Sequence, residues 1–311
     1  VRSAFAEHDD FLQASWSENI ARVSAHAWEA KKIVHALADA GIDAVVTKGN
    51  ISHARIYGGH GLRAFHDVDL MIRSKDAASA APVIEGCGYA AASKFDRTTK
   101  TIVPLPRTQK IIYKLFPDHL PPFCRLFGGS VSHVAVDVAF SMTWAKSPWQ
   151  MANEAYLDEP VWQVVSTEAG DIEWPALAPA YDLLFTVLHS FRESWQLTRD
   201  GVSGVRITHL ADAWRTWANF SDADRERFTS VVEENGMQLP VAWVLARVED
   251  AFDVSVNAHI GLSDFAQPEW INSFKGVDDE YFSWSGSTRE VLSAGGRAAR
   301  ERVDMPRLLG A

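Results

Sequence analysis

The sequence predicts an α+β fold in which a small mixed sheet with flanking helices is followed by a mainly helical C-terminal domain. Three observations support this prediction. Strand-length apolar segments alternate with helix-length segments in the first half of the 311-residue chain. Helical periodicity dominates from residue 179 onward. The composition, 47% apolar and 23% charged, is that of a globular protein. We therefore expect two domains, over residues 1–158 and 159–311.

The first domain alternates between helical and strand patterns. Apolar side chains at three- to five-residue steps predict a long helix over residues 4–40, which Gly41 ends. The later elements follow from the same spacing rules and from the glycines between them: a strand over 42–47, a helix over 49–58, a strand over 68–72, a helix over 75–85, and strands over 110–116 and 131–140.

The second domain opens with a strand–turn–strand pattern over residues 161–174 and is helical afterwards. Helices are predicted over 179–192, 205–219, 222–235 and 240–252. The chain contains 12 tryptophans, a number that suits core or interdomain packing. One or two of them, such as Trp195 near His189, could instead stack on a base or on a planar acceptor.

Charge and composition exclude several classes of protein. The 30 Lys and Arg against 40 Asp and Glu give a net charge of −10, which argues against a general nucleic-acid binder. No run approaches the ~18 apolar residues of a membrane-spanning helix, and the first ten residues lack the apolar core of a signal peptide. Two cysteines, Cys87 and Cys124, form no disulfide framework. We expect a cytoplasmic protein with no membrane partner.

A pair of aspartates marks the most informative segment of the chain. Asp67 and Asp69 flank Val68 in a predicted strand, so both side chains point to the same face. Two carboxylates about 7 Å apart along a strand repel each other unless a cation lies between them. Oxygen ligands of this kind suit Mg²⁺ or Mn²⁺. A solvated strand face would give the same pattern, so the neighbouring segments have to decide between the two interpretations.

The neighbouring segments favour a cation-binding catalytic site over a solvated strand face. Upstream, a predicted strand ends in Lys48-Gly49-Asn50 and runs into a helix, and glycine at such a turn lets backbone N–H groups approach a phosphate. Downstream, Asp137 supplies a third carboxylate from another apolar strand. Three acids on neighbouring strands beside a glycine turn predict a two-metal site for phosphoryl transfer.

These residues resemble the nucleotidyltransferase superfamily typified by DNA polymerase beta. More narrowly, the chain is similar to the bacterial uncharacterised nucleotidyltransferase family, whose members typically read K-G, a helix ending in Y, an R, and D-I-D-L. The matching positions are Lys48-Gly49, Tyr57, Arg63 and the segment from Asp67 to Leu70. The later V-D-L-H-W element of the family is matched by Val136-Asp137-Val138, with Ala139-Phe140 in place of His-Trp. His189, Arg206 and Asp212 resemble positions in the family's helical half, so the likeness spans roughly residues 40–220.

The resemblance implies a nucleotidyltransferase fold and a two-metal reaction with a nucleoside triphosphate (NTP). Asp67 and Asp69 would hold two Mg²⁺ (or Mn²⁺) ions. Asp137 would complete the coordination of the catalytic ion and accept a proton. An acceptor hydroxyl would attack the α-phosphorus, and pyrophosphate would leave. Gly49 and Asn50 would cradle the triphosphate, which Lys48 and Arg63 would neutralise. Two other interpretations stay open, namely that Lys48 is a solvated strand end and that Arg63 is the structural partner of a nearby carboxylate.

The acceptor is not identified by the sequence. A small molecule is the first expectation, a peptide or protein hydroxyl the second, and a tRNA end in a toxin-like system the third; a long nucleic acid is not expected. A pseudoenzyme that binds nucleotide or a partner without turnover is the alternative class. Residues 94–125 carry seven Lys or Arg against two Asp, a net charge of +5. They could hold the triphosphate or an anionic acceptor, or be ordinary surface charge.

Overall fold

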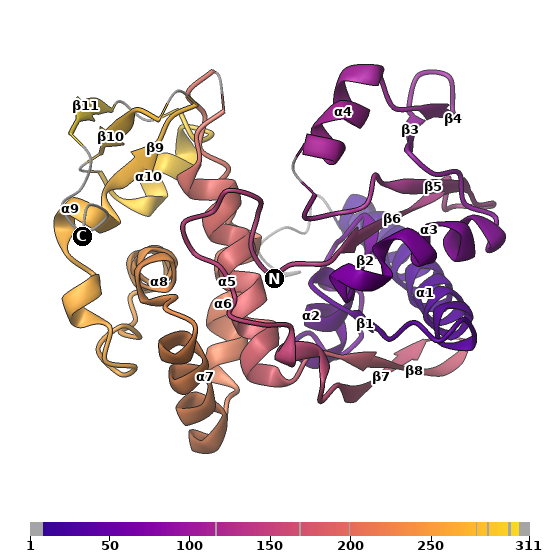
Figure 1. The fold of residues 1–311 in the computed structure, drawn as a ribbon, viewed down its shortest axis with the longest axis horizontal. Coiled ribbons are helices and arrows are strands. Elements are labelled where there is room, and N and C mark those ends of the chain that lie inside the picture. Colours follow the sequence, from indigo (N-terminus) through magenta and orange to yellow (C-terminus); the bar gives the residue numbers. More distant parts are fainter. Residues whose placement is uncertain are drawn as a thin grey trace. The chain divides into compact units, whose positions relative to one another are not determined.

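The chain folds into two units (Figure 1). The computed structural model describes residues 9–304 except positions 116, 168, 199, 278, 285, 298 and 299. The first unit comprises Val1–Lys146 and Asn153–Ala178, and the second comprises Ser147–Ala152 and Pro179–Ala311. In the described part of the chain, no helix combines the length and the apolar character that are needed to cross a membrane.

A six-stranded mixed sheet forms the centre of the first unit, with the strand order β5-β6-β2-β1-β8-β7. The pairs β2–β6 and β1–β8 are parallel, and the other neighbours are antiparallel. The strands are β1 (Ala44–Val46), β2 (Asp67–Ile72), β5 (Phe123–Leu126), β6 (His133–Ala139), β7 (Val161–Thr167) and β8 (Gly170–Ala176). The predicted class, a mixed sheet with flanking helices and a helical C-terminal region, is confirmed.

The helices of the first unit are α1 (Asp9–Asp39), α2 (Gly49–Arg55), α3 (Ala77–Gly86) and α4 (Arg107–Leu115), with a short 3₁₀ turn over Ser74–Asp76. Helices α1, α2 and α3 contribute apolar side chains to the core beside the sheet, whereas α4 contains no buried residue. A two-stranded ribbon of β3 (Ser93–Asp96) and β4 (Thr101–Pro104) lies outside the main sheet.

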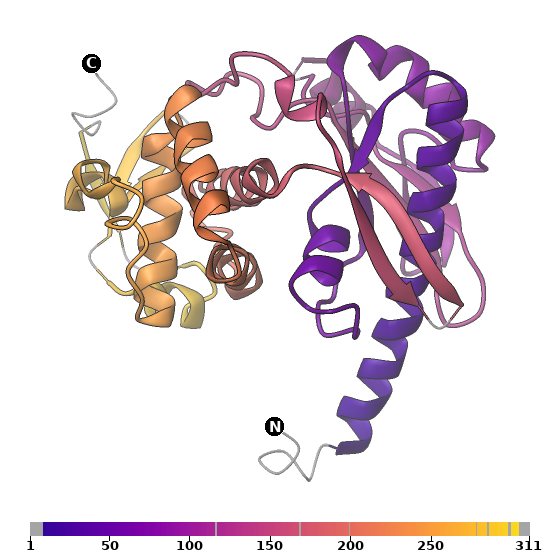
Figure 2. The same ribbon diagram turned by 90° about the horizontal axis from the view of Figure 1, so that it is seen from below.

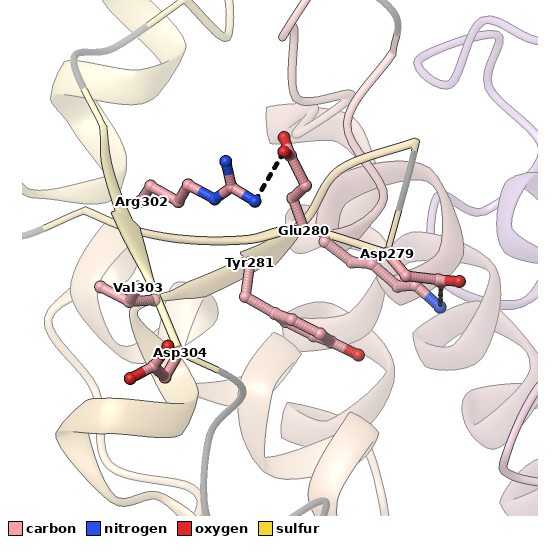
Figure 3. Close-up of a pocket in the computed structure, with 7 residues that line it drawn as sticks. Asp279, Glu280, Tyr281, Arg302, Val303 and Asp304 are labelled. Atoms are coloured by element: carbon pink, nitrogen blue, oxygen red, sulfur yellow. Dashed lines mark ion pairs between the residues drawn. The ribbon is translucent and has the colours of Figure 1, made fainter.

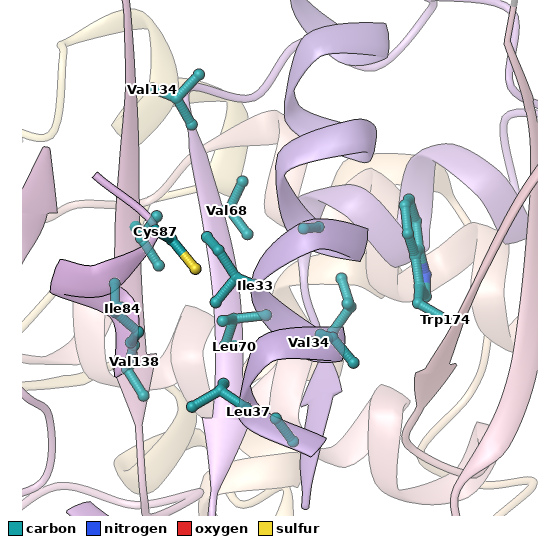
Figure 4. Packing of buried hydrophobic residues seen from close by; sticks show 14 of the residues in the cluster. Ile33, Val34, Leu37, Val68, Leu70, Ile84, Cys87, Val134, Val138 and Trp174 are labelled. Carbon is teal, nitrogen blue, oxygen red and sulfur yellow. The ribbon is translucent and has the colours of Figure 1, made fainter. Parts of the chain in front are cut away.

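The core of the first unit lies between α1 and one face of the sheet (Figures 2 and 4). Ile33 and Leu37 of α1 are fully buried, as are Val68 and Leu70 of β2 and Val138 of β6. These valines and leucines alternate along their strands with the residues of the opposite face. The period-two pattern thus fixes which side chains of β2 and β6 point away from α1.

The second unit is built on four helices: α5 (Pro179–Trp195), α6 (Ile207–Ala218), α7 (Asp222–Glu234) and α8 (Gln238–Phe252). Aromatic rings form its core. The rings of Trp149, Phe191 and Trp270 surround Trp195 at centroid distances of 5.0–5.7 Å. Trp195 is only 2% exposed and donates its indole N–H to Ser273. Of the two interpretations of Trp195, the structure therefore supports core packing.

The C-terminal part of the second unit adds small elements that the sequence did not predict. They are α9 (Pro268–Ile271), α10 (Thr288–Ser293) and a three-stranded sheet of β9 (Ser273–Lys275), β10 (Tyr281–Ser283) and β11 (Glu301–Val303). In a pocket beside β10 and β11, four of the charged side chains that line it pair with each other, Lys275 with Asp279 and Arg302 with Glu280 (Figure 3). These charges are therefore compensated within the protein.

Two expectations from the sequence differ from the structure. The domain boundary expected at 158/159 lies later, because β8 pairs with β1 and brings residues up to Ala178 into the first unit. The strand expected over residues 110–116 is wrong, since α4 covers this segment up to Leu115, and position 116 lies outside the described residues. The run Ile111-Ile112-Tyr113 suggested a strand. The spacing of Lys110 and Lys114, four residues apart, is instead that of one helix face.

Candidate active site

The three aspartates of the predicted site lie on two adjacent strands of the first unit. The parallel register of β2 and β6 pairs Asp67 with Ala135 and Asp69 with Asp137. Val68, between the two aspartates of β2, is buried on the α1 side of the sheet. The carboxylates therefore point to the other side. The sheet brings together on one face three side chains that are up to 70 residues apart in the sequence.

Lys48 reaches into this group of carboxylates from the end of β1. Its ammonium Nζ lies 2.8 Å from Asp69 Oδ1 and 3.8 Å from Asp137 Oδ2, and its side chain is 14% exposed. The Lys48 backbone has φ 51° and ψ −124°, a combination that is strained for any residue with a Cβ. Lys48 is thus a buried counter-charge of the carboxylates, and the interpretation as a solvated strand end does not hold.

The electrostatics of the group show an excess of negative charge. Burial, together with the charge of Asp67, raises the pKa of Asp69 to about 7. Burial also raises the pKa of Asp67, and the charge of Asp137 adds to this effect. Burial alone would lower the pKa of Lys48, but the charges of Asp69 and Asp137 outweigh it and raise that pKa. One ammonium therefore does not neutralise the buried carboxylate of Asp69 and the half-buried ones of Asp67 and Asp137.

Comparison with known proteins identifies the family of this chain. The sequence pattern of the uncharacterised nucleotidyltransferase family matches residues 6–253. The chain belongs to this family. Membership of this family supports an enzyme of the nucleotidyltransferase class, and the resemblance to the uncharacterised nucleotidyltransferase family that was predicted from the sequence is confirmed. A comparison with curated proteins gave no match.

Two solved structures of nucleotidyltransferases show partial similarity. One is the solution structure of the antibiotic-resistance factor ANT(2'')-Ia, with 12% identity and a TM-score of 0.39 over 70% of this chain and 95% of that one. The other is an antigenic nucleotidyltransferase-like protein from Paracoccidioides brasiliensis, with 16% identity and a TM-score of 0.35 over 74% of this chain and 95% of that one.

The donor set of this nucleotidyltransferase suits a hard divalent cation. Carboxylate oxygens are the ligands that Mg²⁺ and Mn²⁺ prefer. Burial and, after it, the charge of Asp67 raise the pKa of Asp69, and a cation at this position would offset both effects. Within the described residues, no three Asp, Glu, His or Cys side chains converge as they would around an ion. The Lys48 ammonium, 2.8 Å from Asp69 Oδ1, is the counter-charge that the structure places there.

Gly49 and Asn50, predicted to cradle a phosphate, are both buried at the start of α2. The Asn50 side chain is 1% exposed, and its Nδ2 donates to the backbone oxygen of Asp67 over 3.3 Å. A Cβ on Gly49 would lie 2.7 Å from the Phe65 Cβ, closer than atoms of folded proteins approach. In this structure both residues support the chain that leads into β2. Their contact with a phosphate stays a prediction.

Replacing Gly49 by alanine is expected to lower the free energy of unfolding by about 1–3 kcal/mol, because the new methyl group overpacks against Phe65. Urea denaturation measures this change. Gly86→Ala is the matched control, since Gly86 also lies in a helix and a Cβ there would meet no atom within 4 Å. The control is expected to be neutral or stabilising. Equal destabilisation by both substitutions would contradict the packing explanation.

Arg63 and part of the basic segment lie near the start of β2. Arg63 is half-buried, donates to the backbone oxygen of Ala64, and its charge lowers the pKa of Asp67 against the larger effect of burial. The charge of Arg97 acts on His66, the residue before Asp67, and helps burial to lower its pKa. These positions agree with either expected role of Arg63, as a phosphate contact or as a partner of a carboxylate.

The rest of the basic segment is more exposed. Lys114 is exposed on α4, a helix without a buried residue, and Lys110 on the same helix is half-buried. Arg125 of β5 is instead structural, because it pairs with the buried Glu29 of α1. The charge of residues 94–125 is therefore divided between surface, core support and the neighbourhood of the site.

In the second unit, His189 of α5 lies with its ring centroid 5.3 Å from that of His209 of α6, and Asp212 of α6 is buried. Arg206 precedes α6 as its N-cap residue. The structure thus places these family-like positions together on neighbouring helices. Their function stays a prediction of the resemblance.

Sequence reasoning missed one residue beside the carboxylates, His119. Its Nε2 atom lies 3.8 Å from Asp137 Oδ2, and an antiparallel bridge pairs it with Ala139. Ala139 is the position at which the resembled pattern carries histidine. One signal for such a residue was present in the sequence, namely that position 139 lacks the histidine of the family pattern. Only the pairing across the strands shows that His119 lies beside this position.

Proposed function

We propose that this nucleotidyltransferase moves a nucleoside monophosphate from an NTP to an acceptor hydroxyl, with two Mg²⁺ or Mn²⁺ ions. The observation that supports this most is the pairing of Asp69 with Asp137 across β2 and β6, with Asp67 two residues away and the negative charge only partly neutralised by Lys48. A triphosphate with its cations is a ligand that such a site would take.

The roles of the residues follow from their chemistry. Asp67 and Asp69 would hold the two ions, and Asp137 would complete the coordination of the catalytic ion. Bound cations would supply charge neutralisation and would lower the pKa of the acceptor hydroxyl. Asp137, whose side chain is 30% exposed against 8% for Asp69, is the more accessible proton acceptor. The new bond joins the acceptor oxygen to the α-phosphorus, the α–β phosphoanhydride bond breaks, and pyrophosphate leaves. Lys48 and Arg63 would neutralise the triphosphate, which Gly49 and Asn50 would cradle.

The acceptor in this proposal is a small molecule, with a peptide or protein hydroxyl second and a tRNA end third. A long nucleic acid and a membrane are not part of it, in keeping with the charge of −10. The cytoplasm is the proposed compartment, and the free, buried thiols of Cys87 and Cys124 support it.

A nucleotide-binding protein without turnover is the second candidate. The 2.8 Å contact between Lys48 and Asp69 favours it, because an ammonium that stays on Asp69 would keep a metal ion away. Release of pyrophosphate in the presence of an acceptor library separates the two candidates, since only the transferase releases it.

Isothermal titration with Mg²⁺ and each nucleotide tests the proposed site. The Asp67→Asn, Asp69→Asn double variant is expected to lose at least about 100-fold in affinity for Mg²⁺–nucleotide, because both proposed metal ligands lose their charge. The matched control is Asp43→Asn, Asp76→Asn, which changes two carboxylates elsewhere in the first unit and should bind as the wild type does. Undiminished binding by the first variant would overturn the proposal.

A further inference from the structure

The sheet face that carries the three aspartates also carries an imidazole to which the proposed reaction gives no role. His119 lies in the segment between α4 and β5, and backbone hydrogen bonds hold this segment against β6. Leu120 N–H donates to the Val138 oxygen over 2.9 Å, and Phe140 N–H donates to the Asp118 oxygen over 3.0 Å. His119 is therefore fixed in position by its main chain.

The pairing of His119 sets the direction of its side chain. It lies opposite Ala139, two residues after Asp137 on β6. Residues two apart on a strand share a face, so His119 and Asp137 are diagonal neighbours on one side of the sheet. Their closest polar atoms, Nε2 and Oδ2, are 3.8 Å apart. This distance is too long for a hydrogen bond but short enough for both atoms to bind one cation.

The other ring nitrogen of His119 is held by a carboxylate. Nδ1 lies 3.2 Å from Asp118 Oδ1, and Asp118, itself 6% exposed, also accepts from the backbone N–H of Ala145 over 3.4 Å. In the neutral ring, donation of Nδ1–H to Asp118 leaves the Nε2 lone pair on the side of Asp137. A carboxylate that orients a histidine in this way is the usual outer shell of a metal-bound imidazole.

We propose that His119 Nε2 is a nitrogen ligand of the same cation that Asp137 binds, and that Asp118 orients the ring for this purpose. The inference rests on the proposed function, because it concerns the catalytic cation of that site. It adds a property that carboxylates alone would not give. An imidazole ligand shifts the preference of a site from Mg²⁺ toward first-row transition-metal ions. The expected cofactor is accordingly Mn²⁺ rather than Mg²⁺.

Pulsed electron paramagnetic resonance of the 311-residue chain with bound Mn²⁺ tests the ligand directly. The electron spin echo of Mn²⁺ is modulated by a coordinated ¹⁴N nucleus, so the wild type is expected to show imidazole modulation that changes when the histidines are labelled with ¹⁵N. His119→Gln is expected to lose the modulation and to bind Mn²⁺ about 10- to 100-fold more weakly. Its affinity for Mg²⁺ should change much less.

Two further variants complete the design. Asp118→Asn is expected to weaken Mn²⁺ binding by about 10-fold, because the ring loses its orienting acceptor. His66→Gln is the matched control, since His66 directly precedes Asp67, and it should keep both the modulation and the affinity. The labelled wild type requires no substitution, so the test also holds if a variant fails to fold.

The outcomes separate this inference from the proposed function. Mn²⁺ that binds through Asp67 and Asp69 without ¹⁴N modulation would overturn the role of His119 and leave the transferase proposal intact. The role of His119 would also be overturned if His66→Gln abolished the ¹⁴N modulation and His119→Gln left it unchanged. A wild type that binds Mg²⁺ but no Mn²⁺ would likewise overturn the inference alone, whereas one that binds neither ion, with or without nucleotide, would overturn the proposed function itself.

Discussion

Replacing Lys48 by methionine is expected to lower the free energy of unfolding of the metal-free protein by about 3 kcal/mol near pH 8. The ammonium is the counter-charge that Asp69 contacts at 2.8 Å, and removal of one partner from a buried ion pair leaves an uncompensated charge. The same substitution is expected to tighten Mn²⁺ binding, because the ion no longer competes with the ammonium for Asp69. Urea denaturation with and without Mn²⁺ measures both effects.

Lys100→Met is the matched control for this experiment. Lys100 is also a lysine at positive φ, 54°, but it is exposed in the turn between β3 and β4. Its replacement therefore repeats the change of side chain and backbone context without touching a carboxylate, and both stability and Mn²⁺ affinity should stay as in the wild type. If Lys48→Met left the affinity for Mn²⁺ unchanged, the ammonium would not compete with the ion for Asp69, and only its proposed contact with the triphosphate would remain.

Metal binding is expected to strengthen as the pH rises toward 7. The pKa of Asp69 is raised from its ordinary value of 3.8 to about 7, so the folded protein binds more protons than the unfolded chain between these values. The stabilising contribution of this carboxyl is present below about pH 4 and is lost as the pH approaches 7. A divalent cation competes with the same proton, and its affinity should fall by about tenfold for each pH unit below 7.

Thermal unfolding at about pH 8 and about pH 5.5, with a fixed concentration of Mg²⁺, checks this dependence. The rise in melting temperature caused by the metal should be clearly larger at the higher pH. Asp69→Asn removes the titrating group and should remove the difference, whereas Asp43→Asn should preserve it. A metal effect that is equal at both pH values in the wild type would contradict the raised pKa of Asp69.

The elements that carry the aspartates could be predicted from the sequence because their pattern is local. The alternation from Asp67 to Leu70 indicated which side chains share a face, and the same held for the strand with Asp137. The prediction that these two strands are neighbours rested on the carboxylates they carry and on the family pattern. The residue-by-residue register, which sets Asp69 directly against Asp137, depends on pairing across the sheet and is visible only in the structure.

Three features could not be predicted because they depend on distant parts of the chain. β8 joins the sheet beside β1, which precedes it by more than 120 residues. Residues 107–115 combine β-branched side chains with helical charge spacing, and local propensity did not decide between strand and helix. His119 has no motif of its own. Its meaning comes from Asp118 beside it and from Asp137 on another strand.

The route of the chain between the two units also limits how they can be separated. Residues Ser147–Ala152 belong to the second unit, where Trp149 packs against Phe191 and Trp195, and the chain then returns to complete the first unit. Neither unit is one continuous stretch of polypeptide. A stop codon after residue 158 would yield a sheet without two of its strands that still carried the tryptophan of the other unit's core. A single proteolytic cut therefore releases neither unit intact. To express one unit alone, a gene would have to join the coding sequences of the two chain segments that form it.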